Sequence, residues 1–270
     1  MIRTLLQLRK SVQRLSPRLL IIWGLCLFLN SLVNAAIPGP IEARLTDRWQ
    51  IVGTGYKPGT RQILFYEYHT FSLDQDGYIE ARYIEYRLPD NTLKSIKEID
   101  YSNENTWTPN FRYDDQEVGY RVGVEVQQNS GRLYRYSEKT SLEESREAIN
   151  PNTVVDAGFD AYIQHVWPRL EKNEKVAFDF LAPLKLNHYG FTLQLKHQNQ
   201  GVCYIEMNLD WLIMDLLFDP VQLEYDCKTR RLMRYQGMTN LRDKDHRQMK
   251  AEIYYQWNTN YPPFRFDSKK

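Results

Sequence analysis

The chain has 270 residues, of which 42% are hydrophobic and 13% aromatic, with 19 tyrosines. This is enough apolar side chain for a folded core, so wholesale disorder is excluded, and the length suits one large β domain or two small ones. The 35 basic and 34 acidic residues nearly balance, which excludes the strongly basic composition typical of a nucleic-acid-binding protein.

The N-terminal segment has the pattern of an export signal. Its first 35 residues hold five basic residues and no acidic one. The unbroken apolar run Leu19–Leu29 begins directly after Arg18, the last of the basic residues. Val33 and Ala35 suit a signal peptidase, which predicts a signal peptide over 1–35 and a periplasmic protein. The apolar run has 11 residues, whereas a membrane span takes about 20. An uncleaved anchor that stretches the span to Ile37 is the alternative.

The mature chain would be weakly acidic, with 30 basic against 34 acidic residues. We therefore expect no nucleic-acid partner, and membrane contact only through the signal segment. Cys203 and Cys227 are the two cysteines that remain. Both fall on the apolar side of alternating segments, which fits either a disulfide or two buried thiols. An oxidising compartment favours the disulfide.

The next part of the chain predicts antiparallel strands. Residues 36–59 form a lead-in and a first strand, and a single β-rich domain is expected over 60–258, in halves 60–140 and 154–258, before a tail at 259–270. The turn Asp74–Gly77 joins two alternating segments as in a β-hairpin. Further turn and alternation signals predict the strands 62–71, 78–87, 93–101, 122–126 and 132–139.

The second half opens with an amphipathic helix. Apolar residues recur at helical spacing from Phe159 to Leu170, and Asp156 suits the N-cap. Pro168 predicts a kink or an end near Trp167. Residues 209–218 predict a short buried helix or an apolar connector. Alternating segments then predict strands near 176–180, 191–195, 202–207, 221–226, 231–238 and 249–257.

About twelve strands and one or two helices predict a mainly β fold. One apolar and one polar face on so many strands favour a large curved antiparallel sheet or a half-open β-barrel, covered by one or two helices.

The second half resembles a family of exported Gram-negative proteins with a domain of unknown function. The matching stretches are VVDAGFDAYIQHVW (154–167), VAFDFLAPLKL (176–186), DPVQLEYD (219–226) and RLMRYQGMTNLRD (231–243). The resemblance covers roughly 60–257 and implies no catalytic residue. It further implies a LolA/LolB-like architecture, in which a half-open barrel shelters acyl chains, although the chain lacks the lipobox of lipid-anchored members. Fold alone does not fix function.

Catalytic, metal and cofactor motifs are absent from the sequence, which predicts a protein that is not an enzyme and needs neither metal nor cofactor. Glu67 and His69 share a strand face, where acid/base work is one interpretation and a solvated pair the favoured one. His188 and His197 could meet only across a sheet edge, and His197 is expected to close an apolar row. The segment 239–243 predicts a turn, or alternatively a functional rim.

Three functions remain open. The favoured one is a module that binds or carries a lipid or other hydrophobic ligand. The alternatives are a structural or interaction protein with an envelope partner, and an unrecognised hydrolase. Inward-facing residues predict the ligand cavity: Phe159, Ile163, Trp167, Phe178, Phe180, Phe191, Leu193, Leu195, Leu223, Tyr225, Ile253 and Tyr255.

Overall fold

The computed structural model describes residues 50–138, 140–210, 220–258 and 264–266. The predicted signal peptide and most of the apolar stretch 209–218 lie outside these residues. Fifteen strands occur in the described part: β1 (Ile51–Tyr56), β2 (Ile63–Leu73), β3 (Ile79–Arg87), β4 (Leu93–Asp100), β5 (Asn110–Asp115), β6 (Tyr120–Gln127), β7 (Ser130–Ser137), β8 (Thr140–Ala148), β9 (Thr153–Val155), β10 (Val176–Ala182), β11 (Asn187–Asn199), β12 (Val202–Leu209), β13 (Val221–Asp226), β14 (Leu232–Arg242) and β15 (Gln248–Trp257).

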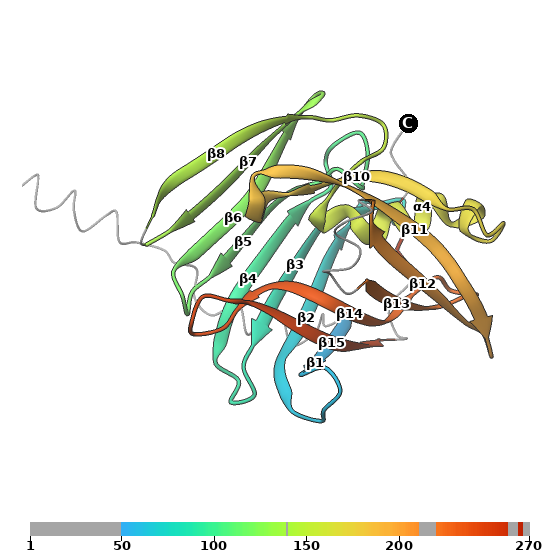
Figure 1. The fold of residues 1–270 in the computed structure, drawn as a ribbon, viewed down its shortest axis with the longest axis horizontal. Coiled ribbons are helices and arrows are strands. Elements are labelled where there is room, and N and C mark those ends of the chain that lie inside the picture. The colour runs from blue at the N-terminus through green and yellow to red at the C-terminus, as the bar shows by residue number, and fades with distance from the viewer. Residues whose placement is uncertain (1–49, 139, 211–219, 259–263, 267–270) are drawn as a thin grey trace, which may run out of the picture. The chain divides into compact units, whose positions relative to one another are not determined.

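The strands form one continuous sheet made of two meanders (Figure 1). In the first, β1 to β8 pair with their neighbours in chain order. In the second, β10 to β15 do the same, and β9 adds to β10 as the one parallel pair among the described strands. The meanders join where β1 pairs with β15, from Ile51 opposite Trp257 to Tyr56 opposite Glu252. The two open edges are β8 and β9.

The β8 end of the sheet curves round to meet the β10–β11 connection, which contains the 3₁₀ turn η3 (Pro183–Lys185). The Arg135 guanidinium donates to the Leu184 carbonyl at 2.9 Å, and the Ser145 hydroxyl donates to the Leu186 carbonyl at 2.8 Å. Side chains therefore close the sheet into a barrel-like arrangement where no backbone ladder does.

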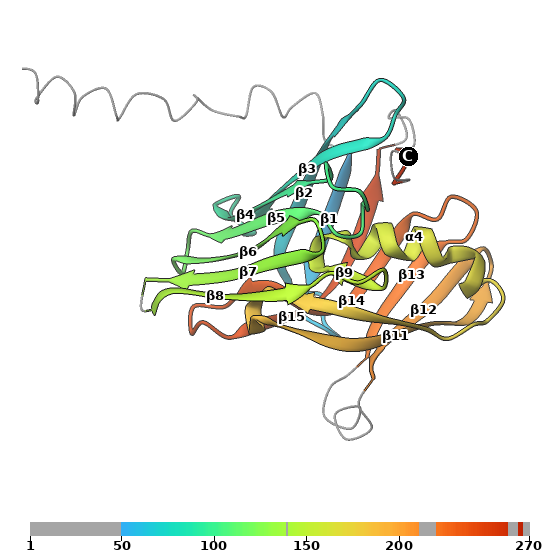
Figure 2. The ribbon, with the colours of Figure 1, turned by 90° about the horizontal axis from the view of Figure 1, so that it is seen from above.

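The helix α4 (Phe159–Leu170) lies beside the strands of the second meander (Figures 1 and 2). Its apolar face is buried, and Trp167 is 2% exposed. The helix continues through Pro168 to Leu170, so the expected end near Trp167 is wrong. Proline in the last turn removes a single backbone hydrogen bond, which leaves the earlier turns intact.

Two groups of buried side chains fill most of the interior. The first meander and β15 hold one, which includes Phe65, Tyr113 and Ile253. The second group packs α4 against β10 to β13 and includes Ile163 and Leu193, both fully buried. Val155 and Leu181 belong to the first group although they lie in the second half of the chain, so the two halves share a core.

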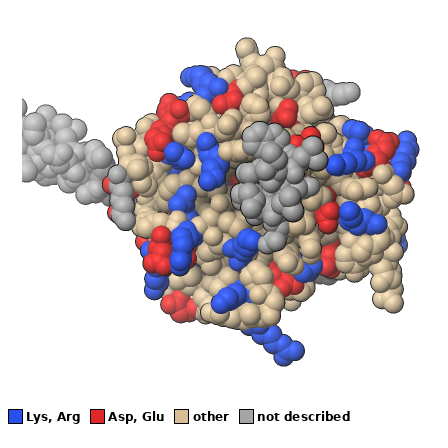
Figure 3. Space-filling view, in the orientation of Figure 1, with Lys and Arg blue, Asp and Glu red and all other residues tan. Residues whose placement is uncertain are grey.

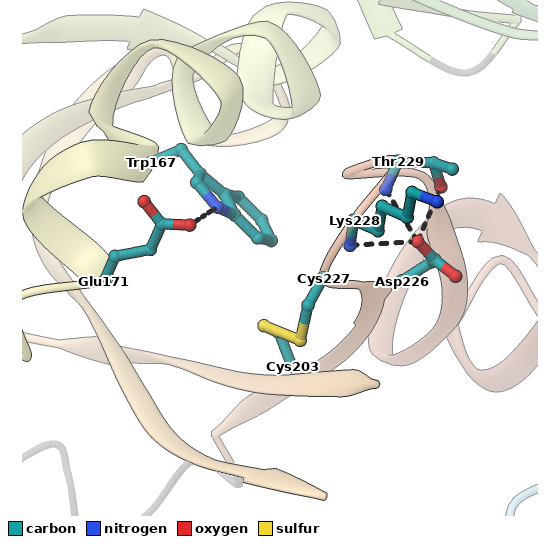
Figure 4. Close-up of a disulfide and its surroundings, with 7 residues drawn as sticks. All are labelled: Trp167, Glu171, Cys203, Asp226, Cys227, Lys228 and Thr229. Carbon is teal, nitrogen blue, oxygen red and sulfur yellow. Dashed lines mark hydrogen bonds between the residues drawn. A yellow bond between two sulfur atoms is a disulfide. The ribbon is translucent and has the colours of Figure 1, made fainter. Parts of the chain in front are cut away.

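A disulfide joins Cys203 on β12 to Cys227 just after β13 (Figure 4). The Asp226 carboxylate accepts hydrogen bonds from the backbone amides of Lys228 and Thr229, at 3.0 and 2.6 Å. These bonds fix the turn that carries Cys227, and Trp167 of α4 lies nearby. The predicted pairing is therefore present in the structure.

The predicted fold class is confirmed: the protein is mainly β, with a large curved and almost wholly antiparallel sheet and one α-helix among the described residues. The sequence indicated about twelve strands, and the structure has more because short or polar strands were missed. β8 is the main case, since its side chains alternate between exposed and half-buried and carry no apolar row.

Candidate ligand-binding cavity

A cavity of about 190 Å³ lies between the two buried groups. Residues of both groups form its apolar wall, which includes Ile51, Ile84, Phe159, Phe180, Met207 and Ile253. Neutral polar side chains such as His69, Asn240 and Tyr255 also line the cavity, together with five charged ones: Glu67, Arg82, Lys97, Asp156 and Asp160. The interior is therefore amphiphilic, with an apolar wall and a charged wall.

Three side chains of β2 and β3 form a hydrogen-bonded chain on the charged wall. The His69 Nε2 atom lies 3.1 Å from a Glu67 carboxylate oxygen. Arg82 donates to the His69 Nδ1 atom from Nε at 3.1 Å and from Nη2 at 2.6 Å. Since the guanidinium always donates, Nδ1 accepts and Nε2–H donates to Glu67.

The pKa of His69 is lowered from 6.5 to about 4, because burial and the Arg82 charge outweigh the attraction of Glu67. The imidazole is therefore neutral at neutral pH, with both ring nitrogens engaged. The interpretation of Glu67 and His69 as a solvated pair is wrong, since their exposed fractions are 5% and 1%. The curvature of the sheet places this strand face inside.

A second polar group links β4, the turn before α4 and β14. The Lys97 ammonium lies 3.0 Å from an Asp156 carboxylate oxygen, and the Asn240 amide donates to the same carboxylate at 2.6 Å. Asp156 was expected to cap the helix, but the N-cap is Gly158 and no side chain caps it. Asp156 therefore binds Lys97 and Asn240, which are distant along the chain, and not a backbone amide of the helix. The segment 239–243, which was expected to form a turn, lies mostly within β14.

Asp160, in the first turn of α4, accepts a hydrogen bond from the Tyr225 hydroxyl at 2.9 Å. Burial raises the pKa of the Asp160 carboxyl above its usual range. Burial also holds the pKa of Tyr225 and Tyr255 well above 10, so both phenols stay neutral. Of these two phenols Tyr255 lines the cavity, where it adds a neutral donor beside the charged groups.

The residues predicted to line a ligand cavity divide into two sets. Phe159, Phe180, Ile253 and Tyr255 line the cavity. The others lie in or against the packed group around α4 and are not among its described lining residues: Ile163, Trp167, Phe178, Phe191, Leu193, Leu195, Leu223 and Tyr225. Sequence alternation identified inward-facing positions, and packing decides which of them border empty space.

The remaining histidines do not converge. His188 contacts Glu147 at 3.1 Å, and His197 stacks on Tyr204 with ring centroids 4.2 Å apart. A register shift after Leu195 turns His197 outward, so the expectation that it closes an apolar row is wrong. Among the described residues no group of three or more His, Cys, Asp or Glu could hold a metal ion.

Surface charge and helix length are the two features of the described residues that concern charged partners and membranes. Figure 3 shows basic and acidic side chains interspersed over the face in view. In the part of the chain that the structure describes, no helix has the length and apolarity needed to cross a bilayer.

Comparisons with known proteins give one structural similarity. No family model matches the chain, and no curated protein matches it. The chain is similar to the crystal structure of a β-barrel-like protein from Brucella abortus, described as a domain of unknown function, DUF1849. The TM-score is 0.37 at 6% sequence identity, and the match covers 77% of this chain and 96% of that one.

Proposed function

We propose that this chain is an exported, non-catalytic binding module whose interior cavity holds a hydrophobic or amphiphilic small molecule, such as part of a lipid. The observation that supports this most is the cavity itself, which has an apolar wall drawn from both meanders and a few fixed polar groups. Such sites are typical of small-molecule binding. The expected LolA/LolB-like architecture, with a barrel that shelters acyl chains, belongs to this proposal.

The size of the cavity limits the ligand. At about 190 Å³, the cavity is smaller than the roughly 300–1,000 Å³ of typical small-molecule sites. The proposed ligand is therefore a short molecule, or one end of a longer one.

The polar groups support binding over catalysis. A general base needs a lone pair within reach of the substrate. Both nitrogens of His69 are engaged, Nδ1 by Arg82 and Nε2 by Glu67. The low pKa of His69 further weakens it as a base at neutral pH. We therefore propose that Glu67 and His69 orient Arg82 and perform no chemistry.

Native mass spectrometry of the protein purified from the periplasm tests this proposal. We expect a co-purified small molecule, and saturable binding of a fluorescent short-chain fatty acid. Ile84 lines the cavity, so Ile84→Phe should fill it and abolish both signals. Ile149→Phe makes the same change at a half-buried position outside the cavity lining and should leave them intact.

Failure of both assays with correctly folded protein would overturn the proposal. It would favour the alternative of a structural or interaction protein of the envelope. Crosslinking in cells would then yield a specific protein or peptidoglycan adduct. Binding that survives Ile84→Phe would place the ligand elsewhere.

A further inference from the structure

Two charged groups in the cavity lack a counter-ion in contact. Glu67 is hydrogen-bonded to His69, and Lys97 is paired with Asp156. Arg82 and Asp160 are different: within the described ranges, neither has an oppositely charged side chain within 4.0 Å. Buried charges are usually paired or bound to a ligand.

Arg82 is held in place with donors to spare. Two of its N–H groups point to the neutral His69 ring, and its guanidinium carbon lies 5.0 Å from the centroid of the Phe71 ring. A guanidinium has five N–H donors in a planar fork. Since His69 takes two of them, the others remain for the cavity and the nearby Tyr101 hydroxyl.

Asp160 faces the same cavity from α4. One of its carboxylate oxygens accepts from Tyr225, and no hydrogen bond to the other is present among the described residues. The charges of Arg82 and Asp160 attract each other across the cavity without contact. The cavity is therefore positive at one place and negative at another, with apolar side chains alongside.

We propose that the cavity binds a zwitterionic group, with its carboxylate or phosphate on Arg82 and its ammonium on Asp160. This inference rests on the proposed function and names the chemistry of its ligand. The planar fork of arginine matches carboxylate and phosphate, which take two parallel hydrogen bonds. An anion alone would face the uncompensated Asp160, and a cation alone would face Arg82. A zwitterion satisfies both.

Two small sources share this chemistry. One is a free α-amino acid with an apolar side chain, which would lie against Ile84 and Phe180. The other is a phosphoethanolamine group at the end of a lipid whose chains remain outside. Leucine and dihexanoyl phosphatidylethanolamine distinguish the two.

Isothermal titration calorimetry with matched ligands tests the proposal. Leucine is compared with N-acetyl-leucine, which has only the anion, and with leucinamide, which has only the cation. Dihexanoyl phosphatidylethanolamine is compared with dihexanoyl phosphatidylglycerol, which has only the anion. In one of the two sets the zwitterion should bind at least about tenfold more tightly, because each charge-assisted hydrogen bond contributes that much.

Two variants assign the two charges. Arg82→Met should weaken binding of the zwitterion and of the anion by about tenfold or more. Asp160→Asn keeps an acceptor for Tyr225 and should weaken only the zwitterion. Arg112→Met and Asp114→Asn make the same changes in surface ion pairs and should change neither. If Arg82→Met does not fold, Arg82→Lys keeps the charge and loses the fork, with the same expected direction.

The outcomes separate this inference from the proposed function. Equal affinity for zwitterion and anion, in a protein that still binds the fluorescent fatty acid, overturns the inference and leaves the function standing. Absence of binding by every ligand overturns both.

Discussion

His69 makes the stability of the protein depend on pH. Its pKa is about 4 in the folded chain and 6.5 in the unfolded one, because burial and Arg82 oppose its charge. Between these values the unfolded state binds the proton and the folded state does not. The free energy of unfolding should therefore be unaffected by His69 above about pH 6.5, and should fall as the pH drops towards 4.

The expected loss from this residue is about 2 kcal/mol between pH 7 and pH 5. Urea unfolding of the wild type and of His69→Gln at both pH values measures it, because the variant lacks the titrating ring. Glu67, Arg82 and Lys97 surround His69 in both proteins, so the difference between them isolates His69. His197→Gln, at an exposed position, should keep the wild-type slope. An equal slope in His69→Gln would contradict the assignment.

Part of this residue-scale arrangement is visible in the sequence. Glu67 and His69 alternate in phase with Phe65 and Phe71, so their common face could be predicted. Arg82 likewise falls in phase with the buried Ile84, and a charge in an apolar row is a signal that sequence reasoning missed. The partners of Asp156 could not be foreseen, since Lys97 and Asn240 lie 59 and 84 positions away along the chain.

The disulfide is the main covalent constraint on the second meander. It connects β12 to the turn after β13, across a sequence separation of 24 residues. The loop-entropy model gives about 3 kcal/mol for such a loop. Cys203→Ala/Cys227→Ala should lower the melting temperature by about 10 °C, measured by circular dichroism.

A reducing agent provides the control for this variant. It should lower the melting temperature of the wild type and leave the doubly substituted protein unchanged. A wild type that melts at the same temperature with and without reductant would contradict a stabilising role for the bond.

The start of α4 depends on a close backbone approach. A Cβ atom on Gly158 would lie 2.2 Å from the Trp107 carbonyl oxygen. Since backbone cannot yield as a side chain can, Gly158→Ala should displace the helix start and cost about 2 kcal/mol. Chemical denaturation measures this cost.

Gly190→Ala is the matched control. A Cβ atom there would meet Asp210 at 3.4 Å, an ordinary contact, so the change in stability should stay within about 0.5 kcal/mol. Equal effects of the two substitutions would show that the Trp107 contact is not what positions the helix. Because Gly158 also precedes Asp160, its displacement should weaken zwitterion binding as well.

Elements with strong periodicity were predicted, and those without it were missed. The apolar spacing from Phe159 to Leu170 predicted α4, although Pro168 does not end it near Trp167 as expected. The strand β8 was missed because it is an edge whose polar side chains pair with neighbours, as Glu143 does with Arg135 and Glu144 with Arg132. Edge strands of this kind carry charges that discourage pairing with other chains, which erases the alternation that would reveal them.

At the scale of the whole molecule, alternation predicts the fold class but not how the sheet closes. Closure depends on single contacts between distant segments, such as Arg135 with the Leu184 carbonyl. The order of the strands also depends on a long-range contact, because β1 and β15, the first and last strands along the described chain, pair with each other. Neither contact leaves a local pattern in the chain.

These long-range contacts should make the two meanders unfold together. The junction strands β1 and β15 bring Ile51 and Ile253 into one buried group with Phe65 of β2, and Leu181 of β10 extends that group into the second meander. The ion pair of Lys97 with Asp156 adds a further link. Separating the meanders would expose this shared core, so neither should persist alone.

Hydrogen exchange followed by mass spectrometry across a urea series measures this cooperativity. Peptides from β5 and β6 report on the first meander, and peptides from β12 and β13 report on the second. The urea concentrations at which the two sets of peptides are half exchanged should coincide. The strand β8 should exchange earlier through local opening, because its outer backbone groups lack strand partners in the described sheet.

Gly55→Val places a branched side chain against the Phe65 ring, which a Cβ atom alone would approach to 2.6 Å. This change at the junction should lower both midpoints equally. If it lowered only one, the meanders would be separate folding units, and the buried group that they share would not couple them.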